Sequence, residues 1–184
     1  MQKHLEDDVA AAMNGDSDAF GRLVDRCSGD INRQMRHYSR EPTVCDELVQ
    51  DVFVEAFFSL GTYRGEAEFG HWLSRIATRV GYRYWKLRKK ESTTVQLQDW
   101  DVIVQKGVDA LEHSEASDLL FALLSRLKDK DRLILTLIYF ENLEYTEVAE
   151  RMGWSQAMTR LRTHRARNRL RDMAKREGLL EALS

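Results

Sequence analysis

The C-terminal half of the sequence contains the stretch Glu144-Tyr145-Thr146-Glu147-Val148-Ala149-Glu150-Arg151-Met152-Gly153-Trp154-Ser155, which has the pattern of a helix-turn-helix. A short helix is expected from Thr146 to Met152, because Gly153 would stop it and Ser155 is a good N-cap for the next helix. Ala149 is small enough to let the two helices cross closely. The pattern therefore predicts a compact helical unit around this turn.

The second helix of this motif is expected to run from Ser155 to about Arg176. Six arginines and no acidic residue lie between Arg160 and Arg171. Arginine suits a DNA interface, because its planar fork reaches phosphates and the O6/N7 edge of guanine. A plain solvated helix is the alternative, but a face of one sign stores repulsion that such a helix would avoid. The inward side is expected to carry Thr159, Thr163, Ala166, Leu170 and Met173.

The composition of the whole chain favours an all-helical protein. The 184 residues include a single proline, Pro42, and charged residues make up 32% of the chain. Hydrophobic residues make up 43%, which is enough for packed cores. From apolar spacing and capping residues, helices are expected over about 5–13, 17–41, 43–60, 71–90, 116–127, 133–140, 146–152 and 155–176.

The helical spacing fails between residues 91 and 113, where polar residues dominate. Only a short helix around 101–106 is compatible with this stretch. A connection of this length is unusual inside one compact domain, so it indicates a domain boundary. The expected fold is therefore all-α, with two small helical domains, residues 1–90 and 114–184, joined by a flexible linker over 91–113. The C-terminal domain contains the helix-turn-helix.

The third expected helix is acidic. Thr43 stands three residues before Asp46, close to the spacing of a capping box, and should start this helix. Between Glu41 and Thr62 there are five acidic residues and neither lysine nor arginine. Taken alone, this pattern also fits an ordinary amphipathic helix with a wet acidic face. The acids should point outward, and the inward side should carry Val44, Leu48, Val49, Val52, Phe53, Ala56 and Phe57.

The fourth expected helix is basic. Six basic residues and no acidic one lie between Arg79 and Lys90. The formal net charge of the chain is −2, yet this segregation of charge indicates two basic faces for DNA and one acidic face for a protein. Three aromatic residues interleave with the bases, a mixture that suits opened DNA strands, and one or two of them should pack inward. They are Tyr82, Tyr84 and Trp85.

The segment before the basic helix, residues 62–70, is expected to be a loop. Gly65 allows a tight backbone, Arg64 supplies charge, and Tyr63 and Phe69 can anchor the two ends. A loop leaves backbone groups free to bond a base flipped out of the duplex. A plain connector with a solvated charge cluster is the alternative. The residues expected in the core just after this loop are Trp72, Leu73 and Ile76.

The sequence contains no sign of an enzyme or a metal site. Cys27 and Cys45 are the only cysteines; they form no CxxC pair and are expected to be reduced packing residues. HExxH, GxGxxG, Walker-type and GxSxG motifs are all absent. No run of about 18 apolar residues exists, and the N-terminus lacks the apolar core of a secretion signal. We therefore expect a cytoplasmic chain with no catalytic activity, cofactor, metal ion or membrane span.

Four stretches together resemble the extracytoplasmic-function (ECF) group of bacterial sigma factors in the sigma-70 family. They are DELVQDVFVEAF from Asp46, YRGEAEFGHWLSRIA from Tyr63, RLKDKDRLILTLIYFENLEYTEVAERMGWS from Arg126 and HRARNRL from His164. The resemblance covers nearly the whole chain. It implies an RNA polymerase sigma factor that directs promoter-specific transcription initiation in a stress or envelope response and is held by an anti-sigma factor.

The resemblance also implies a role for each part. Residues 1–90 would be domain 2, which docks on the β′ clamp helices of core polymerase and melts and reads the minus-10 element. Residues 114–184 would be domain 4, which binds the β flap and reads the minus-35 element, and the linker would occupy the RNA exit path.

The implied polymerase-binding residues are Asp46, Glu47, Leu48, Val49, Gln50, Asp51 and Phe53. The implied minus-10 residues are Tyr63, Arg64, Gly65, Glu66, Phe69, Arg79, Arg83, Lys86 and Arg88. The implied minus-35 residues are Ser155, Gln156, Met158, Thr159, Arg160, Arg162, Arg165 and Arg167.

The chain departs from the family's pattern at several positions. The family commonly has apolar Val and Leu where this chain has Thr159 and Thr163, and polar residues where it has Met158 and Leu161. These exchanges leave open the minus-35 preference and the local rotation of the helix. In the basic helix, an Asn and an Asp common in the family are replaced by Arg79 and Arg83, which leaves the minus-10 preference open. Lys128 follows Leu127 where the family usually has Pro.

Two other functions fit parts of the pattern. An independent helix-turn-helix regulator would bind DNA through residues 114–177 and use residues 1–90 as a sensor or dimer module, although no ligand or phosphoacceptor signature is evident. A sigma-like decoy would bind polymerase without starting transcription. Co-purification with core polymerase separates a sigma factor from the regulator, and run-off transcription separates it from the decoy.

Overall fold

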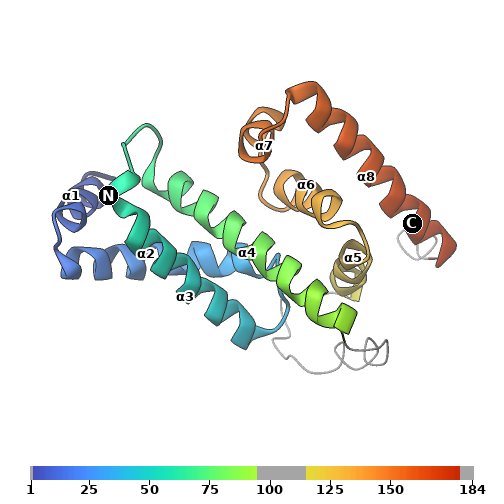
Figure 1. Ribbon diagram of the computed structural model, residues 1–184, viewed down its shortest axis with the longest axis horizontal. Helices are drawn as coiled ribbons and strands as arrows, with labels where there is room; N and C mark the ends of the chain where they lie inside the picture. The colour runs from blue at the N-terminus through green and yellow to red at the C-terminus, as the bar shows by residue number, and fades with distance from the viewer. Residues whose placement is uncertain (1, 95–114, 179–184) are drawn as a thin grey trace. The chain divides into compact units, whose positions relative to one another are not determined.

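Figure 1 shows a computed structural model of the chain, in which residues 2–94 and 115–178 are described. Within these ranges the regular structure consists of eight α-helices and one short 3-10 helix, which confirms the expected all-α fold. The chain divides into two compact units, unit 1 (residues 1–100) and unit 2 (residues 101–184). The elements in chain order are α1 (Gln2–Met13), α2 (Ser17–Met35), α3 (Pro42–Ser59), η1 (Leu60–Thr62), α4 (Phe69–Thr94), α5 (Glu115–Ser125), α6 (Asp129–Tyr139), α7 (Tyr145–Met152) and α8 (Gln156–Arg176).

The first two helices of unit 1 are joined by a tight turn and by an ionic cluster. The side chain of Asp16 caps α2 by accepting two backbone N–H groups of its first turn. Asp8 on α1 lies 2.8 Å from Arg22 and 3.2 Å from Arg26, both on α2. The paired arginines offset the cost of burying most of the Asp8 side chain.

Helices α2, α3 and α4 pack against one another around the core of unit 1 (Figure 1). Leu73 and Ile76 are buried as expected, whereas Trp72 is only half-buried. The amide of Gln34 on α2 also reaches across to α4, where it donates to the backbone carbonyl of Ser74 at 3.2 Å. The largest fully buried apolar side chains of this core are Leu23, Met35, Tyr38, Val52, Leu73, Ile76 and Val80.

A close contact fixes α4 against the end of α2. The indole Nε1 of Trp85 donates to the backbone carbonyl of Tyr38 at 2.8 Å, and the two ring centroids are 4.7 Å apart. Gly81 lies directly against the Tyr38 ring, because a Cβ added there would come within 2.3 Å of a ring carbon. Of the three aromatic residues in the basic helix, Trp85 packs inward, while Tyr82 and Tyr84 are half-buried.

Several helix boundaries in unit 1 differ from those expected, and α2 ends at Met35 rather than just before Pro42. Helix α3 begins at Pro42 with Glu41 as its N-cap, a good fit because proline at the first helical position loses no hydrogen bond. The predicted capping box from Thr43 to Asp46 is therefore wrong, and the Thr43 hydroxyl instead donates to the Glu41 carboxylate at 3.2 Å. Helix α4 extends over Phe69–Thr94. Residues 95–113 of the predicted linker, including its short helix, lie outside the described residues.

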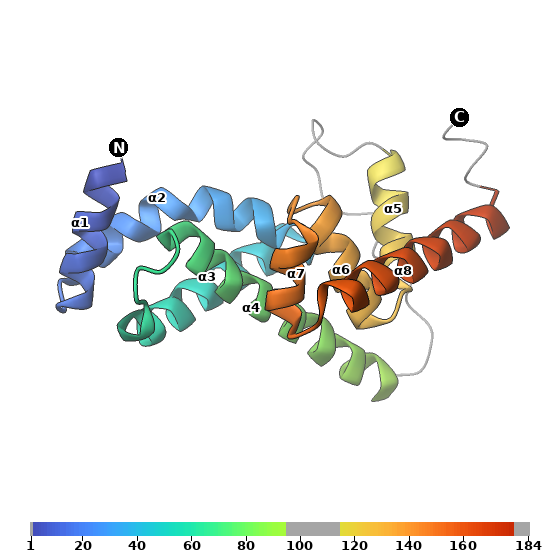
Figure 2. The same cartoon turned by 90° about the horizontal axis from the view of Figure 1, so that it is seen from above.

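Unit 2 is built around the predicted helix-turn-helix. Helices α5, α6 and α7 each contact α8, which runs past them (Figure 2). Gly153 ends α7 with a left-handed backbone (φ 65°), and the Ser155 side chain caps α8 by accepting the Met158 N–H at 3.2 Å. The end of α7 at Gly153 and the capping of α8 by Ser155 were both predicted from the sequence, and both are confirmed. The core of the unit includes Ile134, Leu135, Leu137, Val148, Ala149 and Ala166.

Candidate nucleic-acid interface

Helix α3 separates a buried side from an exposed polar side. Leu48 and Phe53 are buried in the core of unit 1, and Val49 is half-buried. The expectation that Leu48 and Phe53 supply contact area to a partner is therefore wrong, because both side chains already pack within their own unit. The polar residues expected at a protein interface are all exposed, and they are Asp46, Glu47, Gln50 and Asp51.

The exposed side of α3 continues into an apolar patch that was not predicted from the sequence. Val54, Phe57 and Phe58 are 55%, 53% and 82% exposed. Phe57 was expected to point inward, but its ring contacts Phe20 and Phe58 edge-on, at 5.1 and 5.8 Å between centroids. The helical spacing could have revealed the patch, because it extends the outward stripe by one more turn. We call these seven exposed residues the α3 surface: Asp46, Glu47, Gln50, Asp51, Val54, Phe57 and Phe58.

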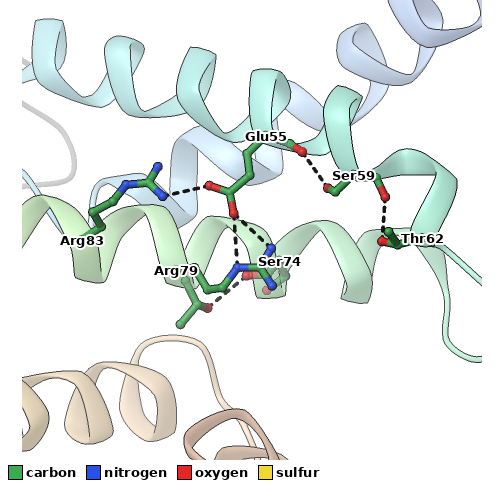
Figure 3. A network of polar contacts seen from close by, with 7 residues as sticks. Glu55, Ser59, Thr62, Ser74, Arg79 and Arg83 are labelled. Carbon is green, nitrogen blue, oxygen red and sulfur yellow. Dashed lines mark hydrogen bonds and ion pairs between the residues drawn. The ribbon is translucent and has the colours of Figure 1, made fainter.

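Glu55 is the acidic residue of α3 that does not point outward. Figure 3 shows its carboxylate shared by two arginines of α4. Nε and Nη2 of Arg79 donate to Oε1 at 3.2 and 3.1 Å, and Nη1 of Arg83 donates to Oε2 at 3.0 Å. Both carboxylate oxygens are thus occupied, in the geometry by which arginines also bind phosphate. The negative charge of Glu55 is thus held between Arg79 and Arg83, both of which were expected to bind DNA.

The loop before α4 is anchored at both ends as expected. Phe69 is buried, Tyr63 is half-buried, and their rings are 5.7 Å apart and nearly perpendicular. The Tyr63 hydroxyl donates to the backbone carbonyl of Ala67 at 2.7 Å, and burial raises the pKa of this phenol. Between the anchors, Gly65 adopts a left-handed backbone (φ 71°). The segment from Arg64 to Glu68 is exposed, so its side chains and backbone are accessible to a ligand.

Lys86 and Arg88, which follow along α4, are exposed, and each lies against an aromatic ring of the same helix. Lys86 lies over the Tyr82 ring, 5.2 Å from its centroid. Arg88 lies over the Tyr84 ring at 5.8 Å and donates to its hydroxyl at 2.9 Å. These contacts restrain long side chains without neutralising their charge.

The inward side of α8 carries hydroxyl groups where a fully apolar stripe would be usual. Thr159, Thr163 and Ala166 are completely or almost completely buried, as expected for this side of the helix. The Thr159 hydroxyl donates to the backbone carbonyl of Ser155 at 3.1 Å, and that of Thr163 to Thr159 at 2.8 Å. These bonds to the preceding turn satisfy the buried hydroxyls. The assignment of Thr159 to direct DNA contact is therefore wrong, because its side chain has no exposed surface.

The arginines of α8 are exposed or half-buried, and several rest on aromatic residues from outside the helix. Arg160 lies 5.7 Å from the centroid of Tyr145, and Arg162 lies 4.6 Å from that of Trp154. Nη1 of Arg167 donates to the hydroxyl of Tyr139 at 3.3 Å, and this bond raises the pKa of the guanidinium. The rings position the guanidiniums and leave their full positive charge available.

Two further arginines of α8 differ in their surroundings. Arg169 forms an ion pair with Asp131 of α6, whose carboxylate is largely buried. Arg165 is exposed and, over residues 2–94 and 115–178, makes no hydrogen bond, ion pair or ring contact. Among the six arginines from Arg160 to Arg171, Arg165 is thus the one most available to a phosphate. The other predicted residues at the start of α8 that are exposed are Ser155, Gln156, Met158 and Arg160.

The cysteines and histidines form no second site within the described part of the chain. Cys45 is buried, with its Sγ 3.2 Å from the backbone carbonyl of Ser39, and Cys27 is half-buried. Burial raises the pKa of both thiols, so both are poor nucleophiles at neutral pH. Among the described residues, no group of three or more His, Cys, Asp or Glu is arranged to hold a metal ion. None of the helices described is long and apolar enough to cross a membrane.

The helix-turn-helix of unit 2, with the exposed arginines of α8, and the basic residues of α4 in unit 1 are the features of a helical DNA-binding protein. Two family models match the chain: "Sigma-70 region 2" over residues 23–91 and "Sigma-70, region 4" over residues 123–172. The chain belongs to the ECF group of the sigma-70 family of RNA polymerase sigma factors. It therefore directs promoter-specific transcription initiation by RNA polymerase, inside the cell, and is not an enzyme.

Individual relatives agree with the family assignment. The chain is 31% identical over 134 residues to the RNA polymerase sigma factor YlaC of Bacillus subtilis, covering 68% of this chain and 74% of YlaC. It is 26% identical over 183 residues to the ECF sigma factor SigW of the same organism, covering 93% of this chain and 97% of SigW. It is also 27% identical to the ECF sigma-E factor of Escherichia coli over 179 residues, covering 91% and 93% of the two chains.

Solved structures share the fold. CnrH, in complex with the cytosolic domain of CnrY, has a TM-score of 0.60 and 24% identity over 98% of this chain and 99% of CnrH. The sigma factor RpoE, in complex with the anti-sigma factor NepR from Bartonella quintana, has a TM-score of 0.64 and 21% identity, covering 85% of this chain and 96% of RpoE. The fold described above is thus one that known sigma factors adopt.

Proposed function

We propose that the two units divide promoter recognition between them. Residues 1–90 form the domain that docks on core polymerase and opens the minus-10 element, and residues 114–184 form the domain that reads the minus-35 element. Residues 91–113 are the linker between them, placed in the RNA exit path. The proposal is supported by the exposed loop and basic helix of unit 1 and by the helix-turn-helix of unit 2.

The α3 surface is the proposed docking site for the β′ clamp helices. It combines exposed carboxylates in its first half with exposed aromatic and aliphatic side chains in its second half. Charged residues steer an oppositely charged partner, whereas buried apolar residues supply most of the affinity. Phe58, at 82% exposure, offers the largest exposed apolar side chain of this surface. Val54, Phe57 and Phe58 thus replace Leu48 and Phe53 as the proposed apolar contacts.

The loop from Arg64 to Glu68 is the proposed reader of a flipped minus-10 base. A stacked base hides its faces and pairing edge, so reading it requires an accessible pocket or backbone outside the duplex. This loop is exposed and held at both ends by buried or half-buried aromatic rings, which fit these requirements. Arg79, Arg83, Lys86 and Arg88 are then proposed to hold the phosphates of the separated strands.

Helix α8 is the proposed reader of the minus-35 element, and its geometry is the single observation that carries the proposal. Its inward side is packed within unit 2, its N-terminus is capped at the turn after Gly153, and its exposed sides carry arginines without any acid from Gln156 to Arg171. This arrangement matches a recognition helix that enters the major groove by its N-terminal part. Arg165 is the best candidate for a phosphate contact, because no other group described in the structure occupies it.

A negative regulator is proposed as a further partner. RpoE was solved in complex with the anti-sigma factor NepR, and this chain shares its fold. The exposed apolar part of the α3 surface is a suitable target for such a protein, because exposed aromatic patches commonly mark protein-interaction sites. With this regulation, the chain would act in the cytoplasm in a stress or envelope response.

Reconstituted transcription with core polymerase and a genomic promoter library tests the proposed function. Core polymerase plus this chain should produce transcripts from a small set of promoters that share two elements, whereas core polymerase alone should not. Binding to core without any transcript would identify a decoy, and specific DNA binding without affinity for core would identify an independent regulator. Either result would refute the proposal.

A further inference from the structure

Two large apolar side chains lie exposed on the outer side of α8. The inward side of this helix is set by Thr159 and Thr163, which are 0% and 2% exposed. At about 100° per residue, Leu161 points almost directly away from these two residues. Leu161 is 49% exposed and Met158 is 44% exposed, so neither belongs to the core of unit 2.

The surroundings of these side chains restrict what can cover them. Arg160, His164 and Arg165 are exposed beside Leu161, and no acidic residue occurs between Gln156 and Arg171. A partner has to bring negative charge to this face and at the same time offer an apolar group to Leu161. An uncharged apolar protein surface would leave the arginines desolvated and unpaired, at considerable cost.

The major groove of DNA meets both requirements. Its rims are lined with phosphates, and among the base edges the C5-methyl group of thymine is the apolar feature. The threonines of this helix carry methyl groups as well, but they are buried and their hydroxyls bond the preceding turn. Among the large apolar side chains of this helix, Leu161 and Met158 are therefore the ones exposed for contact with a base.

We propose that Leu161 and Met158 determine promoter specificity by packing against thymine C5-methyl groups in the minus-35 element. This inference rests on the proposed role of α8 as the minus-35 reader. It specifies how the bases are recognised. The minus-35 element contains thymine at the positions facing these side chains, and α8 recognises the thymine methyl group there rather than a hydrogen-bonding group.

The test uses the holoenzyme and a promoter duplex selected from random-sequence oligonucleotides. Each dT of the upstream element is replaced singly by dU, which removes the methyl group and keeps the pairing. At one or two positions the Kd of the unaltered holoenzyme should rise about fourfold, as expected for one lost buried methyl group. Holoenzyme made with Leu161→Ala or Met158→Ala should lose this sensitivity to dU at the position that the altered side chain reads. Both side chains are exposed, so the variants should keep the thermal stability of the original chain.

A parallel measurement with Arg165→Ala separates failure of this inference from failure of the proposed function. If dU has no effect at any position, or has the same effect in both variants as in the original chain, thymine methyl reading is refuted. If Arg165→Ala still weakens promoter binding in that case, α8 binds DNA but does not read methyl groups. If Arg165→Ala also has no effect, α8 does not face the promoter, and an acidic protein or an anionic lipid surface becomes the candidate occupant of this face.

Discussion

Two pairs of arginines, one in each unit, are restrained in different ways. In unit 1, Arg79 and Arg83 share the carboxylate of Glu55, so part of their charge is already neutralised. In unit 2, Arg160 and Arg162 rest on aromatic rings, which hold a guanidinium in place and leave its charge intact. Arg79 and Arg83 are thus presented at reduced charge, whereas Arg160 and Arg162 keep their full charge.

This difference suits the two steps of promoter recognition. Binding to an intact duplex depends on attraction to phosphates, which favours arginines that carry their full charge at first encounter. Strand opening comes later, and we propose that the arginines paired with Glu55 contribute only after a phosphate has replaced the carboxylate. Unit 2 should therefore dominate initial binding, and the pair in unit 1 should contribute after opening. The predictions below alter one unit at a time.

The largest expected effect comes from Gly81→Ala, which disturbs unit 1 alone. The added Cβ would lie 2.3 Å from the Tyr38 ring, so α4 or the ring has to move. Gly81 lies between Arg79 and Arg83 on α4, and the shift should also break their alignment on Glu55. We expect unit 1 to lose about 3 kcal/mol or more of stability, as in an overpacked core. Chemical denaturation with separate probes for the two units would measure this loss.

Gly21→Ala is the matched control for that experiment. Gly21 lies in α2, and a Cβ added there meets no atom within 4 Å. Because alanine favours a helix interior over glycine, this variant should gain roughly 0.5–1 kcal/mol. Equal losses in the two variants, or unchanged stability in Gly81→Ala, would contradict the packing described for α4.

The next effect concerns the α3 surface of unit 1. Phe58→Ser removes the most exposed apolar side chain of the proposed docking site and should weaken binding to core polymerase at least about tenfold, as at an interface hot spot. Competition with another sigma factor for core would measure the change. Met13→Ser removes an exposed apolar residue of α1 and should compete normally. Full competition by Phe58→Ser would show that polymerase docks elsewhere.

Arg165→Ala makes a smaller change, confined to unit 2. Loss of one phosphate contact should lower the slope of log K against log salt by about 1 and reduce holoenzyme affinity for promoter DNA several-fold. Arg33→Ala, which removes an exposed arginine of α2 paired with Asp30, should leave the slope as it was. If the two variants behave alike, the exposed side of α8 has been assigned to the wrong ligand.

The local signals in the sequence were sufficient for most of this fold. Gly153 and Ser155 act on the backbone within a few residues, so the turn and the start of α8 could be located without knowledge of neighbouring helices. The inward side of α8 was equally predictable, because helical spacing alone places Thr159, Thr163 and Ala166 together. Thr159 was also predicted to contact DNA. This prediction was wrong, because a side chain that packs inward does not also lie on the exposed side of the helix.

The features that escaped prediction depend on which helices are neighbours. Helix α3 carries apolar residues on more than one side, so hydrophobicity alone did not separate the exposed Phe57 and Phe58 from the buried Phe53, and only the outward spacing of the acids points to them. All the acids of α3 look alike in the sequence, and only the packing of α4 against α3 brings Glu55 to Arg79. Tertiary contacts of this kind have no local signature in the sequence.

The contrast between the two units is tested most directly by the salt dependence of promoter binding for Glu55→Gln holoenzyme. Glutamine keeps the shape of glutamate but removes the charge shared by Arg79 and Arg83, and Asp30→Asn makes the same change in charge on α2. We predict tighter binding to an opened promoter and a slope steeper by about 1 for Glu55→Gln, with no change for Asp30→Asn. An unchanged or shallower slope for Glu55→Gln would contradict the account, because it would mean that these arginines do not reach DNA or reach it only while Glu55 holds them.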